Sequence, residues 1–174
     1  MRVLFVCTGN ICRSPSAERL LLAYARAEGI DLSGRVSSAG VRAVIGSAME
    51  PTAADVLTRL GGDPSGFTAR MFTPALARDA DLVLTMTERQ RDRVLAEAPR
   101  AMRRTFTFVE AARLVAATGA SDVATLAAAR TTHRATASPE DVQDPMGREP
   151  AVFERVGAEL ADLTTRILPL LRAV

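Results

Sequence analysis

The stretch that decides the fold lies close to the first residue and reads Val3-Leu4-Phe5-Val6-Cys7-Thr8-Gly9-Asn10-Ile11-Cys12-Arg13-Ser14-Pro15. Its apolar run at 3–6 does not alternate with polar residues, which predicts a strand buried on both faces. Gly9 allows a close approach of the backbone and Asn10 tolerates a left-handed conformation, so a tight loop is expected next. Ser14 and Pro15 then predict a helix start, as its N-cap and its first residue.

The alternation of strand and helix continues along the chain. The next expected elements are strands at 36–39, 81–85 and 105–108 and helices at 51–60 and 88–96. An alanine-rich helix follows the last strand, and the final helix carries an apolar stripe of Val152, Val156, Leu160, Leu163, Ile167 and Leu170. This order predicts an open parallel α/β sheet with right-handed crossovers. Ligands of such sheets bind beyond the carboxyl ends of the strands, where Cys7 stands.

The composition is that of one globular domain, and we expect a single domain over 1–174. Two cysteines are too few for a disulfide-framed secreted scaffold. A net charge of +2 with only 4% aromatic residues does not fit a nucleic-acid-binding face. No apolar run reaches the length of a membrane span, and the apolar start is too short for a signal peptide. We therefore expect a mature, cytoplasmic protein with no membrane span and no nucleic-acid partner.

The spacing of Cys7 and Arg13 has a chemical meaning. Five intervening residues are enough backbone to curl round one tetrahedral oxyanion with the amide N–H groups pointing inward. These amides and the helix N-terminus stabilise a nucleophilic thiolate, and the guanidinium grips two phosphate oxygens as a planar fork. The predicted phosphate-binding residues are Thr8, Gly9, Asn10, Ile11, Cys12, Arg13 and Ser14. The alternative, a small buried cysteine without chemistry, leaves the order of the polar residues unexplained.

Residues 3–15 resemble the phosphate-binding loop of the low-molecular-weight protein tyrosine phosphatases, whose motif is V-C-x-G-N-I-C-R-S-P. The resemblance implies a phosphatase I-like, flavodoxin-like three-layer α/β fold, an open four-stranded parallel sheet flanked by helices on both faces. It implies neither metal nor cofactor. It also implies that Asp144, stiffened by Pro145, is the general acid and that Ser38 braces Asn10. The family pattern leaves 118–141 unmatched, and we expect an insertion there that is either helical or mobile.

The resemblance further implies a two-step hydrolysis of a phosphomonoester. Cys7 attacks phosphorus while Asp144 protonates the leaving oxygen. Water then hydrolyses the cysteinyl phosphate and releases inorganic phosphate, while Arg13 and the loop amides stabilise both transition states. The expected substrate is phosphotyrosine in a phosphorylated protein.

The residues expected to form the substrate pocket wall depart from the family pattern. The family carries an aromatic residue directly after Asp-Pro, where this chain has Met146. The other wall corresponds to the aliphatic residues Val41, Val44 and Ile45. Ile11 favours the tyrosine-specific branch, because the arginine-phosphatase branch resembles T-G-N-T-C-R-S with threonine at that position.

Several alternatives remain open. A protein arginine phosphatase, an arsenate reductase with Cys12 as its only relay thiol, and a non-catalytic phosphoprotein-binding module would all keep the loop. Cys12 is either a packing residue or a resolving thiol that forms a disulfide with Cys7 on oxidation. The single histidine, His133, is expected at the surface and not in a metal site. The charged residues expected to be merely solvated are Glu140, Asp141, Arg89, Arg91 and Arg93.

Overall fold

The computed structural model describes residues 1–133 and 139–172 and has one parallel sheet with the strand order β2-β1-β3-β4. The strands are β1 (Val3–Cys7), β2 (Val36–Gly40), β3 (Leu82–Thr85) and β4 (Thr105–Thr107). The predicted open four-stranded parallel sheet is therefore confirmed. Every residue of β1 is buried, because β2 and β3 flank it and both faces are covered. The carboxyl ends of all strands meet at one edge, where Cys7 lies opposite Gly40.

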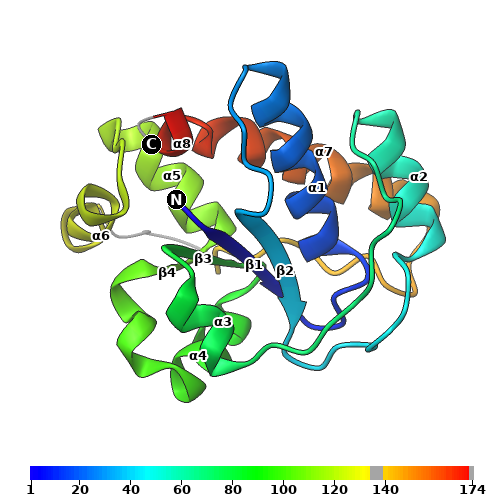
Figure 1. The fold of residues 1–174 in the computed structure, drawn as a ribbon, viewed down its shortest axis with the longest axis horizontal. Helices are drawn as coiled ribbons and strands as arrows, with labels where there is room; N and C mark the ends of the chain where they lie inside the picture. Colours follow the sequence, from blue (N-terminus) through cyan, green and yellow to red (C-terminus); the bar gives the residue numbers. More distant parts are fainter. Residues whose placement is uncertain (134–138, 173–174) are drawn as a thin grey trace.

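Helices cover both faces of the sheet (Figure 1). They are α1 (Arg13–Ala27), α2 (Pro51–Arg59), α3 (Pro74–Asp79), α4 (Glu88–Glu97), the 3-10 helix η1 (Pro99–Arg104), α5 (Phe108–Thr118), α6 (Val123–Thr132), α7 (Pro150–Ile167) and α8 (Pro169–Arg172). Helices α1, α5 and α7 pack on the face that presents Phe5 and Leu84, whereas α3 and α4 pack on the face of Leu4 and Val83. Successive side chains of each strand thus point to opposite faces of the sheet and pack into two separate hydrophobic cores. Within the described ranges, no helix is long and apolar enough to cross a membrane.

Helix α1 begins two residues earlier than the sequence predicts. Arg13 is its first residue and Cys12 its N-cap, without a side-chain capping bond. The prediction that Ser14 is the N-cap is wrong. Its hydroxyl lies 2.9 Å from the Cys7 sulfur and caps no helix N–H group. Pro15 is consequently the third residue of the helix, where its missing N–H still costs no intrahelical bond.

Other elements also differ from the sequence prediction. Phe108 opens α5 and does not end a strand, because Thr107 caps that helix in a capping box with Glu110. The stripe of the last helix is divided, since Pro169 cannot continue the hydrogen-bond ladder and Leu170 belongs to α8. The short elements α3 and η1, each 6 residues long, were not predicted.

The segment 118–141 contains helix α6 in its described part, while residues 134–138 of the predicted insertion lie outside the described residues. Arg130 of α6 stacks on the Phe106 ring, with the guanidinium carbon 3.9 Å from the ring centroid. Its Nε also donates to the Glu110 carboxylate at 2.8 Å. These contacts attach α6 to β4 and α5. That this segment is an insertion stays a prediction.

Candidate active site

Residues 7–13, from the end of β1 to the start of α1, form a curved loop that we call the cradle. Four of its carbonyl groups accept hydrogen bonds from another segment. Backbone N–H groups of residues 41–50 donate to them in four bonds: Val41 to Cys7 at 3.0 Å, Arg42 to Thr8 at 2.9 Å, Val44 to Gly9 at 2.9 Å and Glu50 to Ile11 at 2.7 Å. Among the described residues, the N–H groups of Gly9, Ile11 and Cys12 donate to no backbone acceptor. A loop whose amides are left without protein partners is suited to a phosphate-sized anion.

The side chain of Asn10 stabilises the conformation of the cradle through hydrogen bonds to the surrounding protein. Asn10 is buried and has a φ of 56°, a conformation that short polar residues tolerate best. Its Nδ2 donates to the hydroxyls of Ser14 at 3.0 Å and Ser38 at 2.9 Å, and its Oδ1 accepts from the backbone N–H of Arg70 at 2.9 Å. The structure thus places Ser38 in the contact with Asn10 that the family resemblance implies.

The Cys7 sulfur is buried and has two hydrogen-bond partners. The backbone N–H of Asn10 donates to it at 3.2 Å, and the Ser14 hydroxyl lies 2.9 Å away. The arrangement therefore suits a sulfur nucleophile at the end of the central strand.

Arg13 links the loop to the predicted acid, although the two residues are far apart in the chain. Its side chain is only 4% exposed, and its Nη2 donates to Asp144 Oδ2 at 2.6 Å. Its Nη1 donates to the carbonyl oxygen of Val142 at 3.1 Å. The structure thus brings Asp144 to the guanidinium that the loop supplies. Pro145 follows the acid and accepts a turn bond from the N–H of Arg148 at 3.0 Å.

The segment that carries Asp144 is anchored on the junction between β3 and α4. Val142 is fully buried, and its N–H donates to the carbonyl oxygen of Met86 at 2.8 Å. The Asp141 carboxylate accepts from the N–H of Glu88, the first residue of α4, at 2.7 Å. Asp141 is therefore not the merely solvated charge predicted from the sequence. Glu140 also differs, because it pairs with an arginine of α5.

Cys12 lies beside the cradle as a buried thiol. Burial raises its pKa to about 12, with a further rise from the charge of Cys7 and an opposing effect of Arg13. At neutral pH Cys12 is consequently a thiol and not a thiolate. It packs among Val56, Phe153 and their neighbours, and both cysteines are free.

Three residues that support the loop have no signature in the sequence. Glu18 of α1 interacts with Ser38. Burial raises the pKa of Glu18, while the hydrogen bond with Ser38 and the charges of Arg19 and Arg70 act in the opposite direction. Gln90 of α4 donates to the hydroxyl of Thr8 at 3.1 Å. The third is Arg70, whose backbone N–H reaches Asn10. Only their position in the folded chain identifies them.

A cavity of about 570 Å³ opens beside the loop, and its lining includes Thr8, Arg13, Val41, Arg42, Gln90 and Asp144. Of the predicted wall residues, Val41 lies in this lining. Val44, Ile45 and Met146 do not, and they are 49%, 67% and 43% exposed. Val44 nevertheless lies over the loop, because its N–H donates to the carbonyl oxygen of Gly9.

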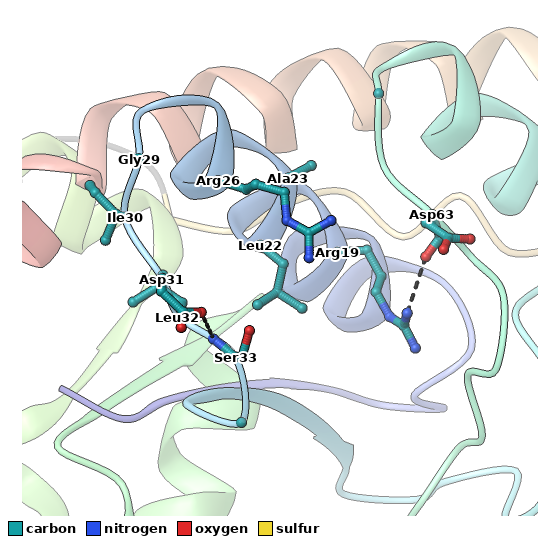
Figure 2. A pocket seen from close by; sticks show the side chains of 12 residues that line it. Arg19, Leu22, Ala23, Arg26, Gly29, Ile30, Asp31, Leu32, Ser33 and Asp63 are labelled. Atoms are coloured by element: carbon teal, nitrogen blue, oxygen red, sulfur yellow. Dashed lines mark hydrogen bonds between the residues drawn. The ribbon is translucent and has the colours of Figure 1, made fainter.

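A second cavity, of about 750 Å³, lies away from the loop between α1 and residues 29–34 (Figure 2). Arg19 and Arg26 line it together with Asp31 and Asp63, so two cations face two carboxylates. Figure 2 shows Arg19 directed at Asp63, whose backbone oxygen accepts from its Nη1 at 3.2 Å. No residue of the cradle lines this cavity, which is therefore separate from the candidate active site.

Within residues 1–133 and 139–172, no group of three or more His, Cys, Asp or Glu side chains is arranged to hold a metal ion. His133 is exposed and ends α6 as its C-cap.

The chain is similar to known phosphatases in sequence and in structure. A family model described as low molecular weight phosphotyrosine protein phosphatase matches residues 2–173. The low molecular weight protein-tyrosine-phosphatase Wzb of Escherichia coli (strain K12) is 41% identical over 97 residues, which span 56% of this chain and 62% of Wzb, less than two thirds of that relative. The solved low molecular weight protein tyrosine phosphatase from T. tengcongensis matches with a TM-score of 0.75 and 30% identity, covering 97% of each chain. The YwlE arginine phosphatase from Geobacillus stearothermophilus matches with a TM-score of 0.73 and 29% identity, over 99% of this chain and 93% of YwlE.

Proposed function

The chain belongs to the low molecular weight phosphotyrosine protein phosphatase family, and from this premise we propose that it hydrolyses phosphotyrosine in phosphorylated proteins through a cysteinyl phosphate. The observation that carries the proposal is the cradle itself. Four of its carbonyls are tied to residues 41–50, the N–H groups of Gly9, Ile11 and Cys12 donate to no backbone acceptor among the described residues, and Cys7 and Arg13 stand at its two ends. A buried sulfur that accepts a hydrogen bond from a backbone N–H and a guanidinium held in place are the groups that phosphoryl transfer to cysteine requires.

In the first step, the Cys7 thiolate attacks phosphorus in line with the leaving oxygen. A sulfur–phosphorus bond forms, the phosphorus–oxygen bond breaks, and Asp144 gives its proton to the departing phenolate. The dianion of the substrate offers Arg13 a second anionic partner besides the carboxylate it holds at 2.6 Å. Asp144 is thereby freed to face the leaving oxygen at the rim of the cradle.

In the second step, Asp144 accepts a proton from water while the water oxygen attacks phosphorus. The sulfur–phosphorus bond breaks, the Cys7 thiolate is regenerated, and inorganic phosphate leaves. Arg13 and the loop amides stabilise the equatorial oxygens in both steps. The residues that we assign to phosphate binding are Thr8, Gly9, Asn10, Ile11, Cys12, Arg13 and Ser14.

Hydrolysis of p-nitrophenyl phosphate and phenyl phosphate tests the proposal. Cys7→Ser is expected to abolish turnover of both, because a hydroxyl is a far weaker nucleophile than a thiolate. Asp144→Asn is expected to lower kcat/KM, which reports the first step, about 100-fold for phenyl phosphate and much less for p-nitrophenyl phosphate, whose leaving group needs no proton. Asp162→Asn, an exposed carboxylate on α7, is the matched control and should leave both rates unchanged. A Cys7→Ser protein that hydrolyses either substrate as fast as the wild type would refute the cysteinyl phosphate mechanism. No hydrolysis by the wild type would favour a phosphoprotein-binding module.

Arginine phosphatase activity is the second candidate, because the YwlE arginine phosphatase shares the fold at nearly the same similarity as the tyrosine phosphatase. Ile11 favours the tyrosine substrate, since the arginine branch carries threonine there. Peptides with phosphotyrosine, phosphoarginine or phosphoserine at one position separate the two activities. We expect the highest kcat/KM with phosphotyrosine, and a higher value with phosphoarginine would replace the proposed substrate. An arsenate reductase is less well supported, because the sequence holds only one further cysteine as a relay.

The two cysteines also suggest a protective disulfide. Peroxide would oxidise the Cys7 thiolate to a sulfenic acid, and the Cys12 thiol would condense with it, forming the disulfide and releasing water. Mild peroxide should then inactivate the wild type reversibly, with recovery in a thiol reductant, whereas Cys12→Ser should recover poorly. Equal recovery of the variant would reject the disulfide. The cytoplasmic location expected from the sequence stays a prediction, which fractionation of cells can test.

A further inference from the structure

Three arginines outside the cradle line the cavity of about 570 Å³ beside it. Arg89 and Arg93 lie four residues apart on α4 and therefore share one face of the helix, and Arg42 enters from the segment after β2. The carboxylates in the lining are those of Asp141 and Asp144. The cavity thus holds more cationic than anionic side chains, unlike the charge-balanced cavity of Figure 2.

The carboxylates of this cavity already have partners, whereas two of the arginines do not. Asp144 pairs with the arginine of the cradle, and Asp141 accepts from the N-terminus of α4. Arg93 pairs with Glu97 of its own helix at 2.8 Å. In the part of the chain that the structure describes, no carboxylate lies within ion-pair distance of the Arg42 or Arg89 guanidinium. The unpaired positive charges of Arg42 and Arg89 therefore lie in the cavity beside the cradle that holds the predicted catalytic cysteine.

Both arginine-bearing segments are bonded to Thr8 of the cradle, one through its backbone and the other through a side chain. The N–H of Arg42 donates to the carbonyl oxygen of Thr8 at 2.9 Å. Gln90, the neighbour of Arg89, donates to the hydroxyl of Thr8 at 3.1 Å. The strand order explains why both reach it: β2 and β3 flank β1, so the residues that follow them lie on either side of the loop that follows β1. The segments that carry the arginines are consequently held against the loop that would bind the phosphate.

We propose that Arg42, Arg89 and Arg93 form a subsite for the carboxylates of acidic residues that flank the phosphotyrosine, so that the preferred substrates are phosphotyrosine segments rich in Asp or Glu. This inference rests on the proposed function, because it concerns the same substrate. Each exposed arginine–carboxylate pair contributes little by itself. Three guanidinium groups in one cavity, however, act together on affinity and on the rate of encounter.

Two phosphotyrosine peptides that differ only in having Glu or Gln on both sides of the phosphotyrosine test the subsite. For the wild type at low ionic strength, we expect kcat/KM to be about tenfold higher with the Glu peptide, and the ratio to fall as salt screens the pairs. A ratio of one at low salt would overturn the proposal without any variant. If the protein hydrolyses neither the peptides nor p-nitrophenyl phosphate, the proposed function itself is wrong.

A triple variant locates the effect. Arg42→Gln/Arg89→Gln/Arg93→Gln should bring the Glu-to-Gln ratio close to one. The matched control is Arg103→Gln/Arg155→Gln/Arg166→Gln, which removes the same charge from exposed sites elsewhere and, like the first triple, includes one helical ion pair. It should keep the wild-type ratio. An equal loss in both triples would mean that net charge alone sets the preference, and would overturn the subsite.

Discussion

Single residues of the cradle depend on partners that lie far away in the sequence. Asn10 bonds to Ser38, 28 residues on, and to Arg70, 60 residues on. The roles of Cys7 and Arg13 could be predicted, because the spacing that relates them lies within one strand–loop–helix unit. Arg70 could not be predicted, since its contact depends on the course of the chain after β2. Local spacing therefore identifies the chemistry of this site but not its supports.

Removal of the Ser38 hydroxyl tests the support of the cradle. Ser38→Ala takes away one hydrogen-bond acceptor of Asn10, and a neutral hydrogen bond contributes about 1 kcal/mol. We expect kcat/KM for p-nitrophenyl phosphate to fall about fivefold. Ser37→Ala, the neighbour on the same strand, is the control and should be as active as the wild type. No loss in Ser38→Ala would show that the other partners of Asn10 are sufficient.

Glu18 predicts a pH dependence of stability. Because burial raises the pKa of this carboxyl in the folded state, its ionisation opposes folding, and the penalty is absent below about pH 4, where the group is protonated in both states. Glu18→Gln removes the penalty. We expect this variant to exceed the wild type in unfolding free energy at pH 7 by a few tenths to about 1 kcal/mol, and the gap to close on acidification. Denaturant titrations of both proteins from pH 4 to pH 7 measure it, and a gap that widens toward acid would contradict the assignment.

At the scale of elements, the long helices and the strands could be predicted and the short elements could not. Hydrophobic periodicity extends over enough residues in β1, β3 and α7 to be recognised, whereas α3 and η1 have 6 residues each. The predicted start of α1 is wrong because the Ser14 hydroxyl bonds to the sulfur of Cys7 and not to the end of the helix. A capping residue is predicted on the assumption that its side chain has no other use, and this assumption fails at an active site.

The attachment of the acid-bearing segment to α4 can be tested through leaving-group dependence. Asp141→Ala removes the acceptor for the N–H of Glu88 at the start of α4, and so weakens the anchor of Asp144. Loss of a charged acceptor at a helix N-terminus costs about 1 kcal/mol. We expect kcat/KM to fall about fivefold with phenyl phosphate and less with p-nitrophenyl phosphate, which needs the acid least in the first step.

The matched control for Asp141→Ala is Asp92→Ala, which removes an exposed carboxylate of α4. It should leave kcat/KM unchanged with both substrates. An equal loss with both substrates would mean that Asp141 acts on the cradle and not on the acid.

At the scale of the whole molecule, the strand order is what creates the site. Alternation of strand and helix predicts a parallel sheet, but it does not state which strands are neighbours. The order β2-β1-β3-β4 puts Arg42, which follows β2, and Arg89, which follows β3, on either side of the cradle. In the sequence, the 41 residues 41–81 separate these two strands. The cationic cavity could therefore not be predicted from composition, in which the arginines are scattered.

The tight crossing of two helices makes a prediction for the stability of the whole molecule. A Cβ added at Gly157 of α7 would lie 2.3 Å from a methyl carbon of Val56 on α2, so the two helices approach closely only because residue 157 is glycine. Gly157→Ala gains about 1 kcal/mol of helix propensity but forces an overlap that costs about 1–3 kcal/mol or more. We expect a net loss of about 1 kcal/mol in the free energy of unfolding, measured by urea titration.

The exposed residue Arg155 on the same helix provides the control for this substitution. Arg155→Ala should change the free energy of unfolding by less than about 0.5 kcal/mol. A Gly157→Ala protein that is more stable than the wild type would show that α2 and α7 can separate without loss.

The central claim, that Cys7 takes the phosphoryl group within the cradle, is tested most directly by trapping the intermediate. Asp144→Asn should slow hydrolysis of the cysteinyl phosphate while p-nitrophenyl phosphate still reacts with the thiolate. Mass spectrometry of this variant, quenched during turnover and digested, should then find one phosphoryl group on the peptide that contains Cys7, bound to its sulfur. Turnover with the phosphoryl group on another residue, or with no phosphorylated protein at any time, would contradict the account.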